Sequence, residues 1–206
     1  TVLQTANGQP YYFNFHATHP GENSIGEKAL ANTLVIGKSG TGKTALINFL
    51  LSQVQKYQPR PTIFFFDKDR GAELFVRACG GRYLRLAQGE PTGFNPLQCE
   101  ATPVNQQFLV DWVKLLANKP SCSASEDEDI QRAVQAMLDT PMPLRTLGNL
   151  QKSLTNLGDD SIYARLRTWT RAGALGWVFD NPQDRIDLAD ASIIGFDYTE
   201  ILDLPQ

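Results

Sequence analysis

Histidine and cysteine, the residues that most often bind transition metals, are scarce in this sequence. It has two histidines and three cysteines among 206 residues. Cys79, Cys99 and Cys122 stand far apart and lack the paired spacing of a zinc site. His16 and His19 lie in a strand-to-loop segment, where edge packing explains them better than a metal. No metal centre of this kind is indicated, and we expect the cysteines to be reduced thiols, as in cytosolic proteins.

Long hydrophobic runs and an excess of positive charge are also absent. Nineteen Lys and Arg against 22 Asp and Glu give a formal net charge of -3, so no global field attracts nucleic acid or anionic lipid. Apolar runs such as residues 63–66 are far shorter than the roughly 20 residues that cross a bilayer. We expect a soluble chain. Its first residue is Thr rather than Met, which suggests a segment excised from a longer protein.

Short apolar runs of the buried-strand type alternate with helical patterns. Four runs are typical of strands in a parallel sheet: residues 32–36, 62–66, 83–86 and 192–196. An aromatic stretch at Tyr11–Phe15 predicts a further strand near the edge of the fold. Between the third and fourth runs, residues 104–171 hold four amphipathic helix patterns. The sequence therefore predicts an α/β fold in which a mainly parallel sheet is interrupted by an all-helical subdomain.

Residues 37–44 read GKSGTGKT and match the phosphate-loop pattern G-x-x-x-x-G-K-[ST], with a predicted strand before and a predicted helix after. Glycines allow backbone N–H groups to point at phosphate oxygens, and the helix dipole favours the same anion. Lys43 would reach the β and γ phosphates, and the Thr44 hydroxyl would bind Mg²⁺. The predicted ligands of ATP and Mg²⁺ are Gly37, Ser39, Gly40, Thr41, Gly42, Lys43, Thr44 and Ala45.

A charged corner, Asp67-Lys68-Asp69-Arg70-Gly71, follows the second predicted strand. Ligands of parallel α/β sheets bind outside the carboxyl ends of the strands, so this corner is expected near the phosphates. Asp67 or Asp69 would orient an attacking water or hold Mg²⁺ through water. These two residues and Lys43 are the predicted catalytic residues. The alternative is a solvated strand-to-helix turn in which Asp69 caps the next helix.

Several segments of this chain together resemble one known family. They read FDKDRGAE at 66–73, GGRY at 80–83 and PTGFNPL at 91–97, with PYYFNFH at 10–16 and GWVFD at 176–180. This combination resembles the ATPase domain of the type IV secretion and conjugation ATPases of the VirB component-four, TrbE, TraC and CagE family. The phosphate loop alone would indicate only an NTPase, whereas the combination is specific, and the resemblance spans nearly the whole chain.

The resemblance implies a RecA-like P-loop motor domain, related to the HerA and FtsK ATPases. Residues 1–97 would be its N-terminal part, 98–172 a helical insertion and 173–206 the return to the sheet. Members of the family oligomerise at the cytoplasmic face of the bacterial inner membrane. They hydrolyse ATP to energise pilus biogenesis and the export of protein or DNA. The implied partners are a small inner-membrane component and companion ATPases.

The Walker B element of this family, an apolar strand ending in acidic residues, has no good match here. Residues 193–197 are superficially similar to it, but we expect Asp197 to be a strand-end turn residue. The resemblance therefore implies that the Walker B acids and the trans-acting arginine lie beyond Gln206. We expect weak or absent ATP hydrolysis by this chain alone.

Three other functions remain open at this point. A DNA-translocating coupling ATPase would use a basic contact such as the run Arg165, Arg167 and Arg171, although the acidic net charge argues against it. A nucleotide-responsive assembly module would bind ATP without hydrolysing it. A small-molecule kinase fits least well, because of the helical insertion and the FDKDRG segment.

Overall fold

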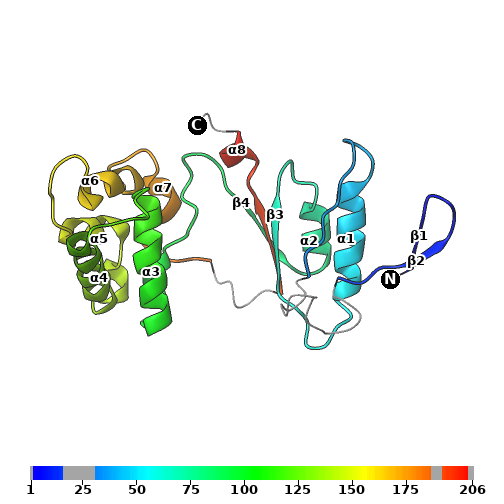
Figure 1. The fold of residues 1–206 in the computed structure, drawn as a ribbon, viewed down its shortest axis with the longest axis horizontal. Helices are drawn as coiled ribbons and strands as arrows, with labels where there is room; N and C mark the ends of the chain where they lie inside the picture. Colours follow the sequence, from blue (N-terminus) through cyan, green and yellow to red (C-terminus); the bar gives the residue numbers. More distant parts are fainter. Residues whose placement is uncertain (1, 16–30, 187–191, 204–206) are drawn as a thin grey trace. The chain divides into compact units, whose positions relative to one another are not determined.

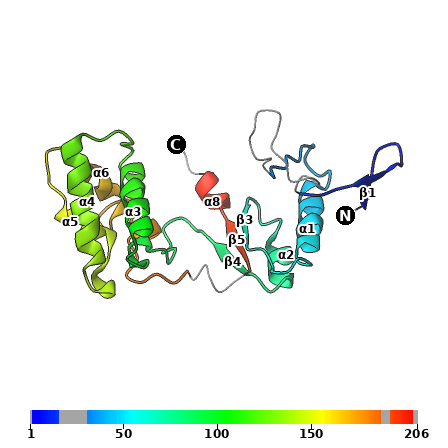
Figure 2. The same cartoon turned by 60° about the horizontal axis from the view of Figure 1, so that its bottom comes forward.

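The computed structural model of the chain describes residues 2–15, 31–186 and 192–203. Figures 1 and 2 show its helices and strands, which form two compact units. The sheet unit comprises Thr1–Leu84 and Ala191–Phe196, and the helical unit comprises Arg85–Asp190 and Asp197–Gln206. Within the described residues, every helix is too short or too polar to span a bilayer.

A three-stranded sheet is the centre of the sheet unit. Its order is β3 (Ile63–Asp67), β5 (Ile193–Asp197) and β4 (Arg82–Arg85), so the last strand of the chain lies between the other two (Figure 2). The Ile63 N–H donates to the Ser192 carbonyl at 2.8 Å, and the Leu86 N–H donates to the Asp197 carbonyl at 3.2 Å. The start of β3 thus pairs with the start of β5, and the end of β4 with the end of β5, as in a parallel sheet. The predicted strands at 62–66, 83–86 and 192–196 are confirmed within a residue.

Two helices pack against this sheet, α1 (Lys43–Val54) and α2 (Glu73–Ala78). The buried contact is made by Val76 of α2 and Ile63, Tyr83 and Ile193 of the three strands, with Leu51 of α1 partly buried beside them. Each strand contributes one face to this core because side chains alternate along a strand. The order strand, helix, strand after residue 62 follows the predicted pattern.

The N-terminal residues form a separate antiparallel hairpin of β1 (Val2–Gln4) and β2 (Pro10–Tyr12). Leu3 is paired with Tyr11, and the turn between the strands contains Gly8 at φ 77°, a conformation that favours glycine. The strand predicted at Tyr11–Phe15 is therefore confirmed at its beginning only.

The prediction of a buried strand at residues 32–36 is wrong. This segment is irregular in the structure, and Leu34 and Ile36 are each 84% exposed. A buried strand needs hydrogen-bonding neighbours for its backbone groups. Among the described residues, the three-stranded sheet has the order β3-β5-β4, and residues 32–36 pair with none of these strands. An apolar pattern is a local signal and does not encode the partner strand.

The helical unit contains the predicted all-helical block. Its elements are η1 (Pro96–Gln98), α3 (Pro103–Leu116), α4 (Ala124–Leu138), η2 (Met142–Leu144), α5 (Leu147–Ser153), α6 (Ile162–Leu166), η3 (Arg167–Trp169), α7 (Gly176–Phe179) and α8 (Thr199–Leu202). A core of its own holds it together, in which Leu109, Val113, Ile130, Leu150 and Leu166 are fully buried. The amphipathic patterns of the sequence predicted these buried faces.

Hydroxyl side chains determine where these helices begin. In α3, α4, α5 and α6 the residue before the helix accepts a hydrogen bond from a backbone N–H three residues later, through Thr102, Ser123, Thr146 and Ser161 respectively. In α4 the bond is reciprocal, because the Glu126 carboxylate accepts from the Ser123 N–H at 2.9 Å. The acidic turn at residues 126–129 is thus a helix N-terminus, as the sequence predicts.

We predict that Glu126 makes the stability of the helical unit depend on acid pH. Its pKa is lowered from 4.5 to about 2, first by the hydrogen bond from the Lys119 ammonium and then by those from Ser123. A lowered folded-state pKa contributes stability that is present above about 4.5 and is lost as the pH falls towards 2. Thermal unfolding followed by circular dichroism across this range should show the loss, and Glu126→Gln should reduce it.

The matched control is Glu128→Gln, which changes an exposed carboxylate of the same helix. We expect this variant to retain the pH dependence of the wild type. Parallel curves for the wild type and Glu126→Gln would contradict the prediction.

Candidate functional site

The predicted phosphate loop leads directly into the N-terminus of α1. Gly40 and Gly42 have φ values of 77° and 88°, in the left-handed region that favours glycine. Gly42 is the N-cap residue of α1, and no side chain caps this helix. The N–H groups of the first helical turn are therefore not satisfied by a capping side chain, and such a helix start favours an anion.

Two side chains of the loop converge on one backbone carbonyl. The Lys43 ammonium and the Thr41 hydroxyl each donate to the Lys38 carbonyl oxygen at 2.8 Å. The loop is tight here, since a Cβ on Gly37 would stand 2.8 Å from the Thr41 hydroxyl oxygen. A phosphate oxygen offers the same acceptor chemistry as the carbonyl, with full negative charge. The ammonium and the hydroxyl are thus two donors that converge on one acceptor in this loop.

The remaining predicted ligands lie on the same exposed loop and first helical turn. Ser39 is in the turn before Gly42, and Thr44 and Ala45 follow Lys43 in α1; all three side chains are exposed. The described structure thus leaves this segment accessible to a nucleotide. The roles of these residues stay predictions.

Asp67, one of the predicted catalytic residues, is the last residue of β3 and is only 6% exposed. Its Oδ2 atom accepts two hydrogen bonds, from the Ala72 N–H at 2.8 Å and from the Tyr83 hydroxyl at 2.7 Å. The carboxylate therefore joins β3 to the start of α2 and to β4. Asp69 is exposed, by contrast, and its backbone is in the left-handed region at φ 66°.

The corner after β3 touches the first turns of α1. A Cβ on Gly71 would stand 3.1 Å from Cγ2 of Thr44, so the Gly71 backbone lies directly against this side chain. One turn later, the Asn48 amide donates to the Gly71 carbonyl at 3.5 Å. The strand end and the phosphate loop are thus neighbours, as the parallel topology predicts.

Sequence reasoning missed two residues of this arrangement, Tyr83 and Gly195. Because β5 lies between β3 and β4, Tyr83 reaches Asp67 across the middle strand. A Cβ on Gly195 would stand 2.5 Å from Cδ2 of the Tyr83 ring, so only glycine leaves room for it. Glycines inside strand patterns mark such close approaches, and the glycine in SIIGF was the available signal.

Asp197 behaves as expected for a strand-end turn residue. Its carboxylate accepts from the N–H of Thr199 at 3.0 Å and from the hydroxyl of the same residue at 2.6 Å. Of the arginines considered for nucleic acid, Arg165 pairs with Asp160 at 2.5 Å, and Arg171 donates to the Asp180 carbonyl at 3.0 Å. Both arginines thus make contacts within the helical unit.

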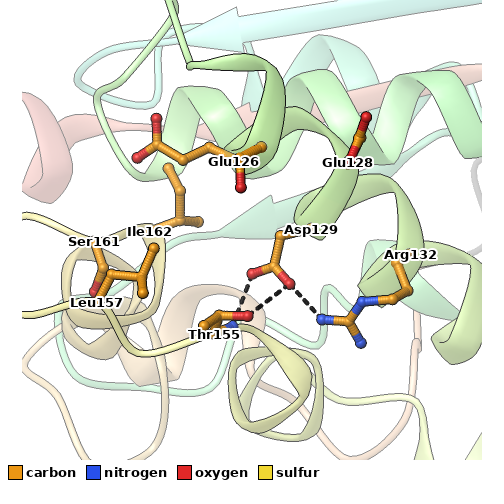
Figure 3. Close-up of a pocket in the computed structure, with 9 residues that line it drawn as sticks. Glu126, Glu128, Asp129, Arg132, Thr155, Leu157, Ser161 and Ile162 are labelled. Carbon is orange, nitrogen blue, oxygen red and sulfur yellow. Dashed lines mark hydrogen bonds and ion pairs between the residues drawn. The ribbon is translucent and has the colours of Figure 1, made fainter.

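A hollow of about 340 Å³ lies in the helical unit, beside the N-terminus of α4 (Figure 3). Figure 3 shows Asp129 directed at Thr155, whose N–H donates to it at 2.7 Å, while Arg132 pairs with the same carboxylate. These bonds join α4 to the loop before α6. Across the part of the chain that the structure describes, no group of three or more His, Cys, Asp or Glu residues is placed to hold a metal ion.

Comparison with known proteins finds close relatives, although the sequence matches no family model. Over 98% of its length the chain is 45% identical to type IV secretion system protein virB4 of Bartonella henselae and 42% identical to PtlC of Bordetella pertussis. The virB4 protein of Brucella suis is 39% identical over the same share. The chain spans about a quarter of the length of these relatives, 24 to 26%.

A solved structure, that of VirB4 of Thermoanaerobacter pseudethanolicus, has a similar fold. The TM-score is 0.65 at 16% sequence identity, and the match covers 98% of this chain and 57% of that chain. At this identity the match supports the fold alone.

We predict that Asp67→Ala strongly destabilises the sheet unit. The substitution leaves the Ala72 N–H and the Tyr83 hydroxyl without their buried acceptor, and hydrogen bonds to a charged group contribute about 1.5–3 kcal/mol. We expect the free energy of unfolding, measured by urea titration, to fall by about 3 kcal/mol. Asp69→Asn, which keeps a residue tolerant of the left-handed region, should cost less than about 1 kcal/mol. Equal effects of the two variants would refute the prediction.

Proposed function

Because the chain is homologous, over 98% of its length, to a segment of the VirB4 and PtlC type IV secretion proteins, we propose that it forms the nucleotide-binding part of a secretion ATPase. The resemblance identified in the sequence is thus confirmed. In this proposal the sheet unit is the first part of a RecA-like motor domain, and the helical unit is its insertion. The intact protein hydrolyses ATP to energise pilus biogenesis and the export of protein or DNA.

The observation that carries this proposal is the phosphate loop at the N-terminus of α1. The Lys43 ammonium, the Thr41 hydroxyl and the uncapped start of α1 lie within one short segment. Both side chains donate hydrogen bonds to a single oxygen, that of the Lys38 carbonyl. This donor set fits a triphosphate. Lys43 would bind the β and γ phosphates, and Thr44 would hold Mg²⁺, which supplies positive charge to the phosphate oxygens.

We assign different roles to the two acidic residues after β3. Asp69 is exposed to solvent and is therefore the better candidate to orient a water molecule. Asp67 is buried, and its Oδ2 already accepts two hydrogen bonds. Hydrolysis by this chain alone is expected to be weak or absent.

The proposed setting is the cytoplasmic face of the bacterial inner membrane. There the intact protein would form oligomers and contact a small inner-membrane component and companion ATPases. Direct translocation of DNA is less favoured, because Arg165 and Arg171 of the basic run are engaged within the helical unit.

The proposal predicts that Lys43→Ala weakens nucleotide binding by about 10- to 100-fold, the equivalent of losing a charge-assisted hydrogen bond to phosphate. Isothermal titration calorimetry of the chain with Mg²⁺ and ATPγS measures this affinity. Lys38→Ala is the matched control, because it removes a neighbouring lysine whose backbone carbonyl, rather than side chain, contacts Lys43.

We expect the control to bind within about threefold of the wild type. A folded wild-type chain that gave no heat of binding would overturn the proposed function. Binding without turnover in the intact protein would instead support a nucleotide-responsive assembly module.

A further inference from the structure

A single carboxylate oxygen ties together three segments of the sheet unit. Oδ2 of Asp67 accepts from the Ala72 N–H at 2.8 Å and from the Tyr83 hydroxyl at 2.7 Å. Both bonds are short and end on an ionisable group that is 6% exposed, which makes them strong and directional. One bond fixes the chain where it enters α2, and the other fixes β4.

The bond from Tyr83 has to cross the middle strand. Neighbouring strands are about 4.8 Å apart, so β3 and β4 are separated by about 10 Å with β5 between them. The ring passes over Gly195, where a Cβ would stand 2.5 Å from Cδ2 and 2.9 Å from Cε2. The buried ring therefore has little freedom, and its hydroxyl is directed to Asp67 by the strand beneath it.

From Asp67 the contacts continue to the phosphate loop. The anchored N–H belongs to Ala72, and the preceding residue, Gly71, lies against Thr44 with 3.1 Å between its virtual Cβ and Cγ2 of Thr44. Asn48 of the same helix donates to the Gly71 carbonyl at 3.5 Å. A displacement of Ala72 would therefore move the surface against which Thr44 packs.

The backbone between the two anchors is strained. Asp69 and Arg70 are consecutive non-glycine residues with φ values of 66° and 58°. Such conformations persist only where the surrounding structure holds them. The Asp67 to Ala72 bond closes this loop and is one of the contacts that hold it in that form, together with the Arg70–Glu73 ion pair. Losing the bond would remove one restraint on this loop and on the Gly71 backbone that packs against Thr44.

We propose that the bond between Tyr83 and Asp67, which crosses Gly195, positions the Thr44 hydroxyl for the metal-dependent part of nucleotide binding. Asp67 and Tyr83 are then positioning residues that act through Gly71, and Asp67 is neither a metal ligand nor a base. This inference rests on the proposed function. It adds β4 and β5 to the site that the phosphate-loop pattern defines.

The test separates metal-dependent from metal-independent affinity. The chain is titrated with ATPγS by calorimetry, once with Mg²⁺ and once with EDTA. Tyr83→Phe removes one oxygen atom, and we expect it to weaken binding about tenfold with Mg²⁺ and less than about twofold with EDTA. In the proposed function Lys43 and the loop N–H groups would contact phosphate directly, so they would still act when the metal is removed.

Gly195→Ala provides an independent route to the same effect. Its added methyl group would push the Tyr83 ring away from Asp67, so it should reproduce the Mg²⁺-specific loss. The double variant Tyr83→Phe with Gly195→Ala should bind no more weakly than either single variant, because both substitutions remove the same contact, the bond between Tyr83 and Asp67. Tyr57→Phe, at a tyrosine that is 61% exposed, is the matched control and should behave like the wild type.

Each result has a distinct meaning. If the wild type binds better with Mg²⁺ than with EDTA and Tyr83→Phe changes neither affinity, the positioning proposal is overturned while the proposed function stands. Equal weakening in both solutions would indicate a general loss of structure and would also overturn it. A Mg²⁺-specific loss in Asp67→Asn but not in Tyr83→Phe would identify Asp67 as a direct ligand of the metal. A wild type that binds no nucleotide would remove the proposed function and this inference together.

If Gly195→Ala fails to fold, Tyr83→Phe decides alone, since it adds no atom to the core. Its melting temperature, measured before the titration, shows that the chain is folded at the temperature of the experiment.

Discussion

The two hydrogen bonds on one oxygen of Asp67 are the constraint on which the sheet unit's candidate site depends. They connect the end of β3, the start of α2 and the middle of β4, and β5 takes part because Gly195 lets the Tyr83 ring pass. The segments FDKDRG, GGRY and SIIGF thus each supply one residue to the same contact, namely Asp67, Tyr83 and Gly195. Gly81 of the second segment is similarly constrained, since a Cβ there would stand 2.6 Å from the Ile193 carbonyl oxygen.

The helical unit depends on local signals and has a core of its own. Hydroxyl residues begin four of its helices, and apolar residues at helical spacing form the buried faces. Both signals lie within a few residues of the element that they specify, so the sequence could predict these helices. The hollow beside α4 combines local and non-local contacts, because Glu126 caps α4 while Asp129 holds the loop before α6, 26 residues further along the chain.

Prediction was less complete in the sheet unit because strand pairing is not local. The runs at 62–66, 83–86 and 192–196 became strands, whereas the equally apolar run at 32–36 lies outside the described sheet. The helix that begins at Lys43 was predictable from the local pattern, whereas the binding of phosphate by the loop before it stays a prediction. The partner of Asp67 was not predictable, because the bond from Tyr83 crosses β5, a strand that comes from the far end of the chain.

A carboxylate beside the proposed triphosphate site raises an electrostatic question, because two anions in a medium of low dielectric constant repel strongly. At Asp67 the two donors place partial positive charge against Oδ2, which offsets the cost of burying the carboxylate. The negative charge of Asp67 therefore strengthens hydrogen bonds within the protein. An amide at this position would accept the same two bonds more weakly. Asp69 has the opposite environment, because its side chain is exposed to solvent and its backbone is in the left-handed region. Two aspartates two residues apart thus have separate physical tasks, one holding the loop in place and the other facing the water around it.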